Sequence, residues 1–295
     1  MPRLAFEVSS GQKLHHRGAE NLIRSILARG TGGRRKGVLD LSKLEFITPY
    51  GVIVLITMLN RDAHGFRSLR LICPKSIDCL NYLGVSGFFQ HLPNYVTLKE
   101  DLGRATKEAS WTSQTVLPLT HLDNTSRVAE VTKKVRERIS QMMGDTSDGE
   151  RGSIMQLIPS TTKELCQNVF DHARVDQGWV AAQRYSNAST PYIELAIGDA
   201  GCGIRATLVD EYPELRERRE ASVLRLMIDE GLSRREGGGM GYSLLRRAAD
   251  KLDGRFLLRS GRGAVRKPRY RSGLTSSMKD CEWPGTQLMV RFSCA

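Results

Sequence analysis

Three short motifs follow one another in the second half of the chain, and their order constrains the fold more than any other feature of the sequence. The first, ELCQNVFDHA over residues 164–173, places Glu164, Asn168 and His172 at intervals of four. At about 3.6 residues per turn these side chains share one face of a helix. Such a face fits a cation site, because an amide oxygen suits Mg²⁺ and a carboxylate one turn away can act as a base. A solvent-facing polar stripe is the simpler alternative.

The second motif, IELAIGDAGCGI over residues 193–204, ends an apolar strand at Asp199 and continues into a turn with Gly201 and Gly203. A carboxylate at a strand end can accept a hydrogen bond from an adenine amino group. The glycines would let the backbone pass close to the base, because they carry no Cβ. Taken alone, the motif also fits an ordinary acidic turn.

The third motif, EGGGMG over residues 236–241, precedes an amphipathic helix that runs through Leu252. Backbone N–H groups in a glycine loop and at a helix N-terminus can hold phosphates. No lysine follows the last glycine, which excludes the common P-loop. No strand leads into the loop and no βαβ unit surrounds it, which excludes the dinucleotide fingerprint.

In this order and spacing, the three motifs resemble the N, G1 and G2 boxes of the GHKL ATPase superfamily, which includes histidine kinases, gyrases and chaperones. The pair Gly285–Thr286, before the last strand, resembles the terminal GT element of that superfamily. The resemblance covers approximately residues 122–292.

This resemblance implies ATP and Mg²⁺ as cofactors. It makes Asn168 the Mg²⁺ ligand and Glu164 the catalytic carboxylate that activates the attacking group. It makes Asp199 the acid that reads adenine. The remaining positions would support the nucleotide, with Gly201 and Gly203 at the adenine, Gly239 and Gly241 at the phosphates, and Thr286 beneath the adenine.

The helix expected over residues 123–143 contains no histidine, so a sensor kinase with a phospho-acceptor histidine there is not favoured. The domain is more similar to the anti-sigma serine kinases, whose motif reads ENxxxHA. Gln167 stands here in place of the glutamate before the asparagine, which weakens the match at the catalytic base.

The second half is expected to form a domain over residues 122–295, an α/β sandwich whose mixed sheet has helices on one face. Asp123 or Asn124 would cap the first helix. The expected helices and strands are helices over 123–142, 153–173 and 242–252, and strands over 179–185, 192–197, 256–259 and 287–292. The polar stretch over residues 101–121 is expected to be a linker.

In residues 1–100, strands alternate with helices, which predicts an α/β domain. Ser76 is expected to cap a helix that runs to Leu83. The segment VLDLSKLEFITPYG and the later LNYLGVSGFF resemble STAS domains, the fold of anti-sigma-factor antagonists. In that family a serine at the start of a helix receives phosphate. Tyr50 occupies the acceptor position and Thr48 lies two residues earlier, so the resemblance implies a docking role rather than a phosphoswitch.

The composition places few further limits on function. No segment is apolar and long enough to span a membrane, and no signal peptide is visible, so a cytoplasmic protein without a membrane partner is expected. The six scattered cysteines fit neither a zinc site nor a disulfide framework. The net charge of +12 favours an anionic partner. Residues 255–271 hold seven basic side chains and no acidic one, which fits either a solvated loop or a contact with nucleic acid or an acidic protein.

The sequence therefore favours an ATP-dependent regulatory protein with ATPase or serine/threonine kinase activity on a protein partner, with a homodimer as an open question. A non-catalytic, anti-sigma-like binding module is the first alternative. An ATP-gated nucleic-acid-binding protein is the second.

Overall fold

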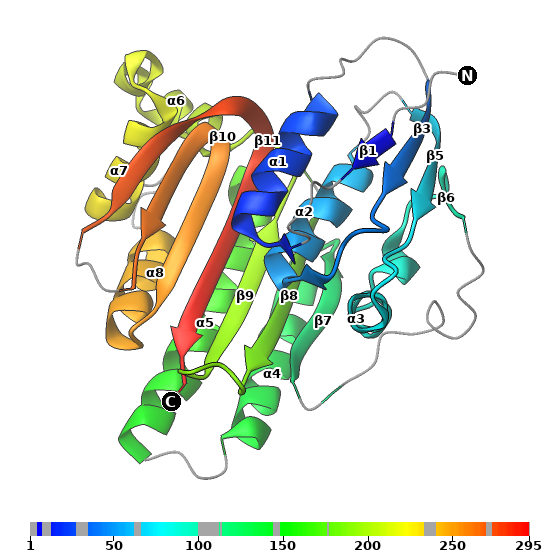
Figure 1. The fold of residues 1–295 in the computed structure, drawn as a ribbon. Coiled ribbons are helices and arrows are strands. Elements are labelled where there is room, and N and C mark those ends of the chain that lie inside the picture. The colour runs from blue at the N-terminus through cyan, green and yellow to red at the C-terminus, as the bar shows by residue number, and fades with distance from the viewer. Residues whose placement is uncertain are drawn as a thin grey trace. The chain divides into compact units, whose positions relative to one another are not determined.

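The computed structural model describes residues 5–7, 13–27, 35–61, 66–99, 112, 114–143, 148–175, 177–232, 240–269 and 273–294. The chain divides into two compact units, Met1–Thr112 and Ser113–Ala295, whose elements are labelled in Figure 1. Each unit combines helices with strands, which confirms the α/β class.

The first unit is built on a parallel sheet with the strand order β1-β3-β5-β6. The strands are β1 (Ala5–Glu7), β3 (Arg35–Asp40), β5 (Phe66–Ile72) and β6 (Val96–Leu98), and a separate parallel pair joins β2 (Lys13–Leu14) to β4 (Phe46–Ile47). Between them lie α1 (His16–Leu27), α2 (Pro49–Leu59), α3 (Ile77–Val85) and the short η2 (Phe89–His91). The predicted alternation of strands and helices is confirmed.

Helix α2 is apolar on every side, and all of its residues are buried. Its start is fixed by Thr48, whose hydroxyl accepts a hydrogen bond from the N–H of Gly51 at 3.4 Å, and by Pro49, which suits the first turn of a helix. The predicted N-cap of α3 is confirmed, because the Ser76 hydroxyl accepts from the N–H of Cys79 at 3.3 Å.

The second unit contains a five-stranded sheet with the order β10-β11-β9-β8-β7. Its strands are β7 (Thr115–Leu122), β8 (Gly178–Tyr185), β9 (Tyr192–Gly198), β10 (Arg255–Lys267) and β11 (Thr275–Ser293). All pairings in it are antiparallel, so the prediction of a mixed sheet is wrong. Hairpins connect β8 to β9 and β10 to β11, so the two strands of each pair run antiparallel. Strand β9 also pairs antiparallel with β11.

The prediction of a linker over residues 101–121 is wrong in its last part, because Thr115–Leu122 forms β7 and belongs to the sheet. Pro118 and the polar Thr120 weaken the strand pattern in the sequence. Pro118 is tolerated because β7 is an edge strand, where a missing backbone donor breaks no interior pairing.

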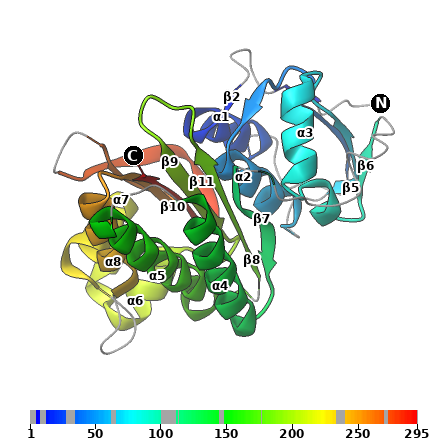
Figure 2. The same cartoon turned by 90° about the horizontal axis from the view of Figure 1, so that it is seen from below.

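The helices of the second unit gather on one face of its sheet, as Figure 2 shows from below. They are α4 (Thr125–Met142), α5 (Asp148–His172), α6 (Ile204–Glu211), η4 (Pro213–Glu217), α7 (Glu220–Glu230) and α8 (Met240–Lys251). Asn124 caps α4, accepting from the N–H of Arg127 at 3.0 Å. The alternate residues Ile193, Leu195 and Ile197 of β9 join the core beneath these helices, so the predicted helix-covered face is confirmed.

The basic stretch over residues 255–271 is not a solvated loop, because residues 255–267 form β10. Arg259 is fully buried, and its guanidinium donates to the carbonyls of Gly261, Gly263 and Cys281. Lys267 is buried and donates to the carbonyl of Gly254 at 3.1 Å. These two cations are therefore committed to the fold and cannot contact a nucleic acid.

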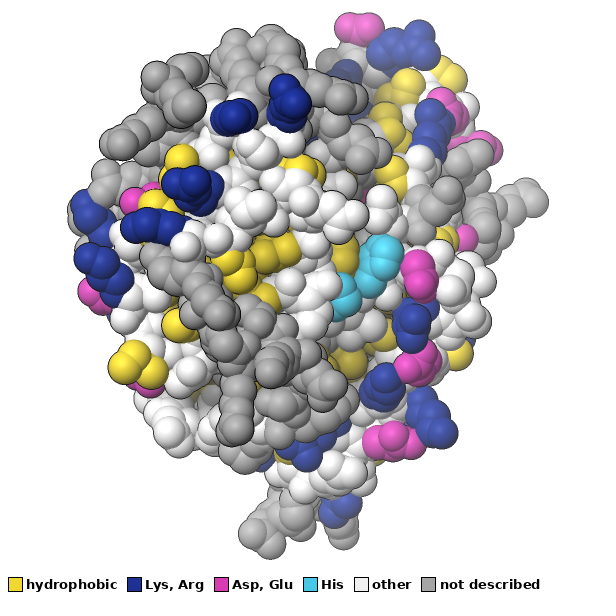
Figure 3. All heavy atoms as spheres, turned by 90° about the vertical axis from the view of Figure 1, so that its right-hand side faces the viewer, with side chains coloured by type: hydrophobic (Ala, Val, Ile, Leu, Met, Phe, Trp, Pro, Cys, Tyr) yellow, Lys and Arg dark blue, Asp and Glu magenta, His cyan; other side chains and the backbone are white. Residues whose placement is uncertain are grey.

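Surface charge is mixed rather than uniformly basic over the residues that the structure describes. On the face drawn in Figure 3, basic and acidic side chains lie beside one another along the lower right edge. Basic and acidic side chains also pair along α4, as Lys134 does with Glu130 at 2.6 Å. None of the helices in the described ranges has both the length and the apolar character needed to cross a bilayer.

Candidate functional site

The polar face of α5 lies directly against the start of α8. A Cβ built at Gly241 would be 3.1 Å from Nδ2 of Asn168 and 3.5 Å from Cβ of Glu164. Glu164 and Asn168 therefore share the face that their spacing predicts, and Gly241 leaves the space into which the Asn168 amide projects. The first and third motifs, well separated in the sequence, meet here.

Both polar side chains on this face lack partners among the described residues. Asn168 is partly buried, and its Nδ2 atom is buried without a hydrogen bond. Neither the Asn168 Oδ1 nor the Glu164 carboxylate has a hydrogen bond or ion pair within the part of the chain that is described. A buried amide without a partner is uncommon and costs stability. This face is therefore a candidate binding site.

Asp199 follows β9 and is held by two backbone donors on one oxygen. Its Oδ1 accepts from the N–H of Gly201 at 2.8 Å and from the N–H of Thr286 at 3.2 Å. Its Oδ2 accepts no hydrogen bond from any residue that the structure describes. The main chain of Asp199 is fixed as well, because its N–H donates to the Thr286 carbonyl at 2.9 Å and its carbonyl accepts from Gln287 Nε2 at 3.1 Å.

The Asp199 carboxyl is 5% exposed. Burial raises its pKa to about 7, against the opposing effect of the hydrogen bonds from Gly201 and Thr286. At neutral pH the group is therefore poised between its two protonation states. A buried carboxyl with a perturbed pKa and one oxygen not engaged by any described residue is a candidate functional group.

Glycine is required around Asp199 at two positions for different reasons. A Cβ at Gly201 would overlap the carbonyl oxygen of Ala173, at the end of α5. That carbonyl accepts from the N–H of Cys202 at 2.9 Å. This hydrogen bond connects the second motif to the end of α5, the helix that carries the first motif. Gly285 has φ +81°, and a Cβ there would lie 2.6 Å from Asp199 Oδ1.

Ser260, which belongs to none of the sequence motifs, connects the second motif to the Gly285–Thr286 pair. It is buried, and its hydroxyl accepts from the N–H of Ile204, next to Gly203, at 2.9 Å. The same hydroxyl donates to the Gly285 carbonyl at 3.1 Å. Thr286 lies within 3.4 Å of it through Oγ1.

Tyr242, the residue after Gly241, is a second side chain that motif reasoning missed. Burial raises the pKa of its hydroxyl, and the charge of Asp199 raises it further. The Tyr242 hydroxyl is thus within electrostatic range of the Asp199 carboxyl. The residue before it, Gly241, lies against the Glu164–Asn168 face.

Some predicted positions lie outside the described residues. Gly239 is one of them, and the side chain of His172 is another. Within the described ranges, no three His, Cys, Asp or Glu side chains cluster as a metal site would require. A cation here would depend on Asn168 and on oxygens supplied by a ligand.

The side chains at the start of α2 in the first unit, where Tyr50 lies, are buried. Tyr50 is 1% exposed and Thr48 is 2% exposed. Neither hydroxyl is presented to a kinase active site in this structure.

Comparison of the chain with protein-family models and with curated proteins gave no match.

Proposed function

We propose that the second unit binds Mg-ATP and that the chain is an ATP-dependent regulatory protein, acting as an ATPase or as a serine/threonine kinase on a protein partner. One observation carries the proposal: the buried carboxyl of Asp199 commits one oxygen to the N–H groups of Gly201 and Thr286, and its other oxygen is not engaged by any described residue. An adenine amino group is a donor that fits the unengaged oxygen.

The donor set fits Mg²⁺ in the way that nucleotide sites commonly hold it. Mg²⁺ keeps several waters and takes few protein ligands, with phosphate oxygens completing its shell. The Oδ1 atom of Asn168 would supply the single protein oxygen. The bound ion would neutralise charge on the phosphates, which is the main contribution needed in phosphoryl transfer.

Glu164 lies one helical turn before Asn168 and has no described partner that would neutralise or sequester it. In this position it would orient and deprotonate the attacking water or hydroxyl. Gly241 and the N-terminus of α8 would face the phosphates, because helix N-termini attract anions. Gly201, Gly203 and Thr286 would shape the adenine end.

The first unit would supply the partner surface, as the resemblance to STAS domains suggests. Burial of Tyr50 supports a docking role over a phosphoswitch at this position. A protein partner or a second copy of the chain could occupy this surface.

Turnover of γ-labelled ATP by the full chain tests the enzymatic part of the proposal. We expect Glu164→Gln to keep ATP binding and to lower turnover by roughly 100-fold or more, the usual contribution of a general base. Glu150→Gln, the same change about four turns earlier on α5, is the matched control and should keep turnover.

Label recovered as inorganic phosphate would indicate hydrolysis, and label on a protein would indicate transfer. If Glu164→Gln turns over ATP at the wild-type rate, the catalytic assignment is wrong. If ATP binds without any turnover in the wild type, the chain is a nucleotide-dependent binding module.

A further inference from the structure

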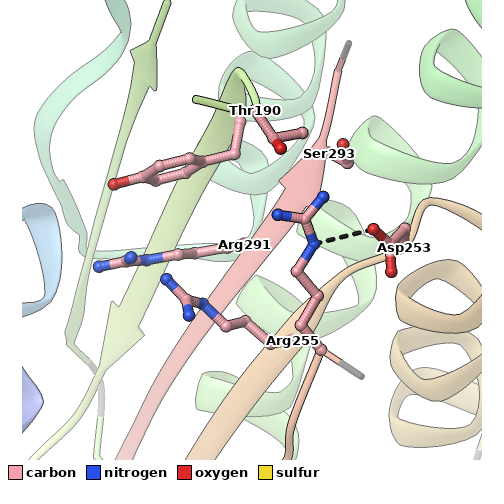
Figure 4. A pocket seen from close by; sticks show the side chains of 7 residues that line it. Thr190, Asp253, Arg255, Arg291 and Ser293 are labelled. Carbon is pink, nitrogen blue, oxygen red and sulfur yellow. Dashed lines mark hydrogen bonds and ion pairs between the residues drawn. The ribbon is translucent and has the colours of Figure 1, made fainter. Parts of the chain in front are cut away.

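A second polar site lies at the opposite end of the sheet from Asp199. A pocket there is lined by Arg255 of β10, Arg291 and Ser293 of β11, Arg269 and Asp253 beside them, and Thr190 of the β8–β9 turn (Figure 4). Tyr192, which opens β9, also lines it. Because β9 separates Tyr192 from Asp199, the two sites are about 20 Å apart.

Two of the three arginines in the pocket are neutralised by carboxylates. Arg291 pairs with the buried Glu194 at 2.7 Å and lies over the ring of Tyr192 at 4.7 Å. Arg269 pairs with Asp253 at 2.8 Å. Arg255 has neither an ion pair nor a hydrogen bond with any described residue, so the pocket retains an uncompensated positive charge.

Arg255 is an exposed side chain, and its position sets it beside a second positive charge. Arg255 and Arg291 are directly paired in the antiparallel ladder, where like charges destabilise. Figure 4 shows their guanidinium groups reaching toward the same side. The pKa of Arg255 is lowered by partial burial first and then by the charge of Arg291, and a bound anion would relieve this repulsion.

Two hydroxyls complete the set of donors. Thr190 and Ser293 line the pocket, and neither hydroxyl is hydrogen-bonded within the described ranges. Adjacent guanidinium groups with free hydroxyls match a tetrahedral oxyanion, which offers more acceptor oxygens than a carboxylate. The pocket is not explained by a nucleic-acid base stacking on Tyr192, because Arg291 already covers that ring.

We propose that this pocket binds a phosphate group, with Arg255 and Arg291 as its cationic donors and Thr190 and Ser293 as its neutral donors. The chemistry is shared by free phosphate and by a phosphorylated side chain of a partner protein. The assignment stands independently of nucleotide binding at Asp199.

Calorimetric titration of the full chain with inorganic phosphate, phenyl phosphate and a phosphoserine peptide, at constant chloride, tests the proposal. We expect Arg255→Gln to weaken binding of all three about tenfold or more, the effect of losing one charged hydrogen bond. Arg255→Lys, which keeps the charge, should recover part of the loss and shows that the strand still folds. Arg136→Gln, at an exposed arginine of α4, should bind as the wild type does.

The comparison among ligands identifies the source. A phosphoserine peptide that binds more tightly than inorganic phosphate, with its advantage lost in the unphosphorylated peptide, indicates a partner's phosphate; equal affinities indicate free phosphate. Asp199→Asn should leave all three affinities unchanged. No binding at millimolar phosphate, or equal binding by the wild type and Arg255→Gln, would overturn the proposal.

Discussion

Replacing Asp199 by asparagine should stabilise the second unit at high pH while removing the carboxylate that we propose to recognise adenine. The amide oxygen of the substituted side chain could still accept from Gly201 and Thr286, so the turn would keep its two hydrogen bonds. What the substitution removes is the cost of burying a carboxylate, which is also the source of the raised pKa.

The size of the effect follows from the shift of the Asp199 pKa from 3.8 to about 7. The folded chain binds this proton more tightly than the unfolded chain does. The resulting stabilisation is complete below pH 3.8 and is lost as the pH rises through 7. The whole shift corresponds to about 4 kcal/mol, of which roughly 2.5 kcal/mol falls between about pH 5 and pH 8.

Urea unfolding of the wild type and of Asp199→Asn at several pH values measures this difference. Tryptophan fluorescence suits the assay, because Trp179 and Trp283 are buried in the second unit. We expect the free energy of unfolding of Asp199→Asn, measured relative to that of the wild type, to rise by roughly 2.5 kcal/mol between about pH 5 and pH 8. A difference that stays constant with pH, or that favours the wild type at high pH, would refute the assignment of a costly buried carboxylate.

Three further predictions concern the same neighbourhood. ATP should bind about tenfold more weakly at pH 6 than at pH 8 in calorimetric titration, because Asp199 must be ionised to accept from adenine; an unchanged affinity would contradict this. Gly285→Ala should lower the free energy of unfolding by at least roughly 2 kcal/mol in urea, since a side chain is strained at φ +81° and meets Asp199, whereas Gly273→Ala, which meets nothing within 4 Å, should not. Gly241→Ala should keep or raise helix stability by about 0.5–1 kcal/mol yet weaken Mg-ATP binding several-fold by crowding the Asn168 amide; wild-type affinity would show that this contact is unimportant.

The parts of the fold that sequence reasoning identifies are those with local signals. Ser76 and Asn124 are recognisable as helix starts because each cap bonds within its own first turn. The shared face of Glu164 and Asn168 follows from helical periodicity alone. The proximity of Gly241 to that face is expected only through the resemblance to a known superfamily.

The parts that sequence reasoning misses depend on long-range pairing. Strand β7 contains Pro118 and polar residues, and only its partner β8 makes it a strand. The sequence predicts a strand only over residues 256–259, whereas β10 runs on to Lys267, and its pairing with β11 buries Ser260 as well as Arg259. Arg255 and Arg291 come together only through the same ladder, so no local pattern could reveal their pocket.

Binding of ATP and GTP to the full chain at pH 8, where Asp199 is ionised, tests the central claim most directly when Mg²⁺ is present. Adenine carries an amino group where guanine carries an acceptor oxygen, so the unengaged oxygen of Asp199 would accept from ATP and repel GTP. We expect the wild type to prefer ATP by at least about 100-fold, since a buried polar group left unpaired is costly, and Asp199→Asn to lose that preference. Equal binding of the two nucleotides by the wild type, or binding of neither, would contradict the account.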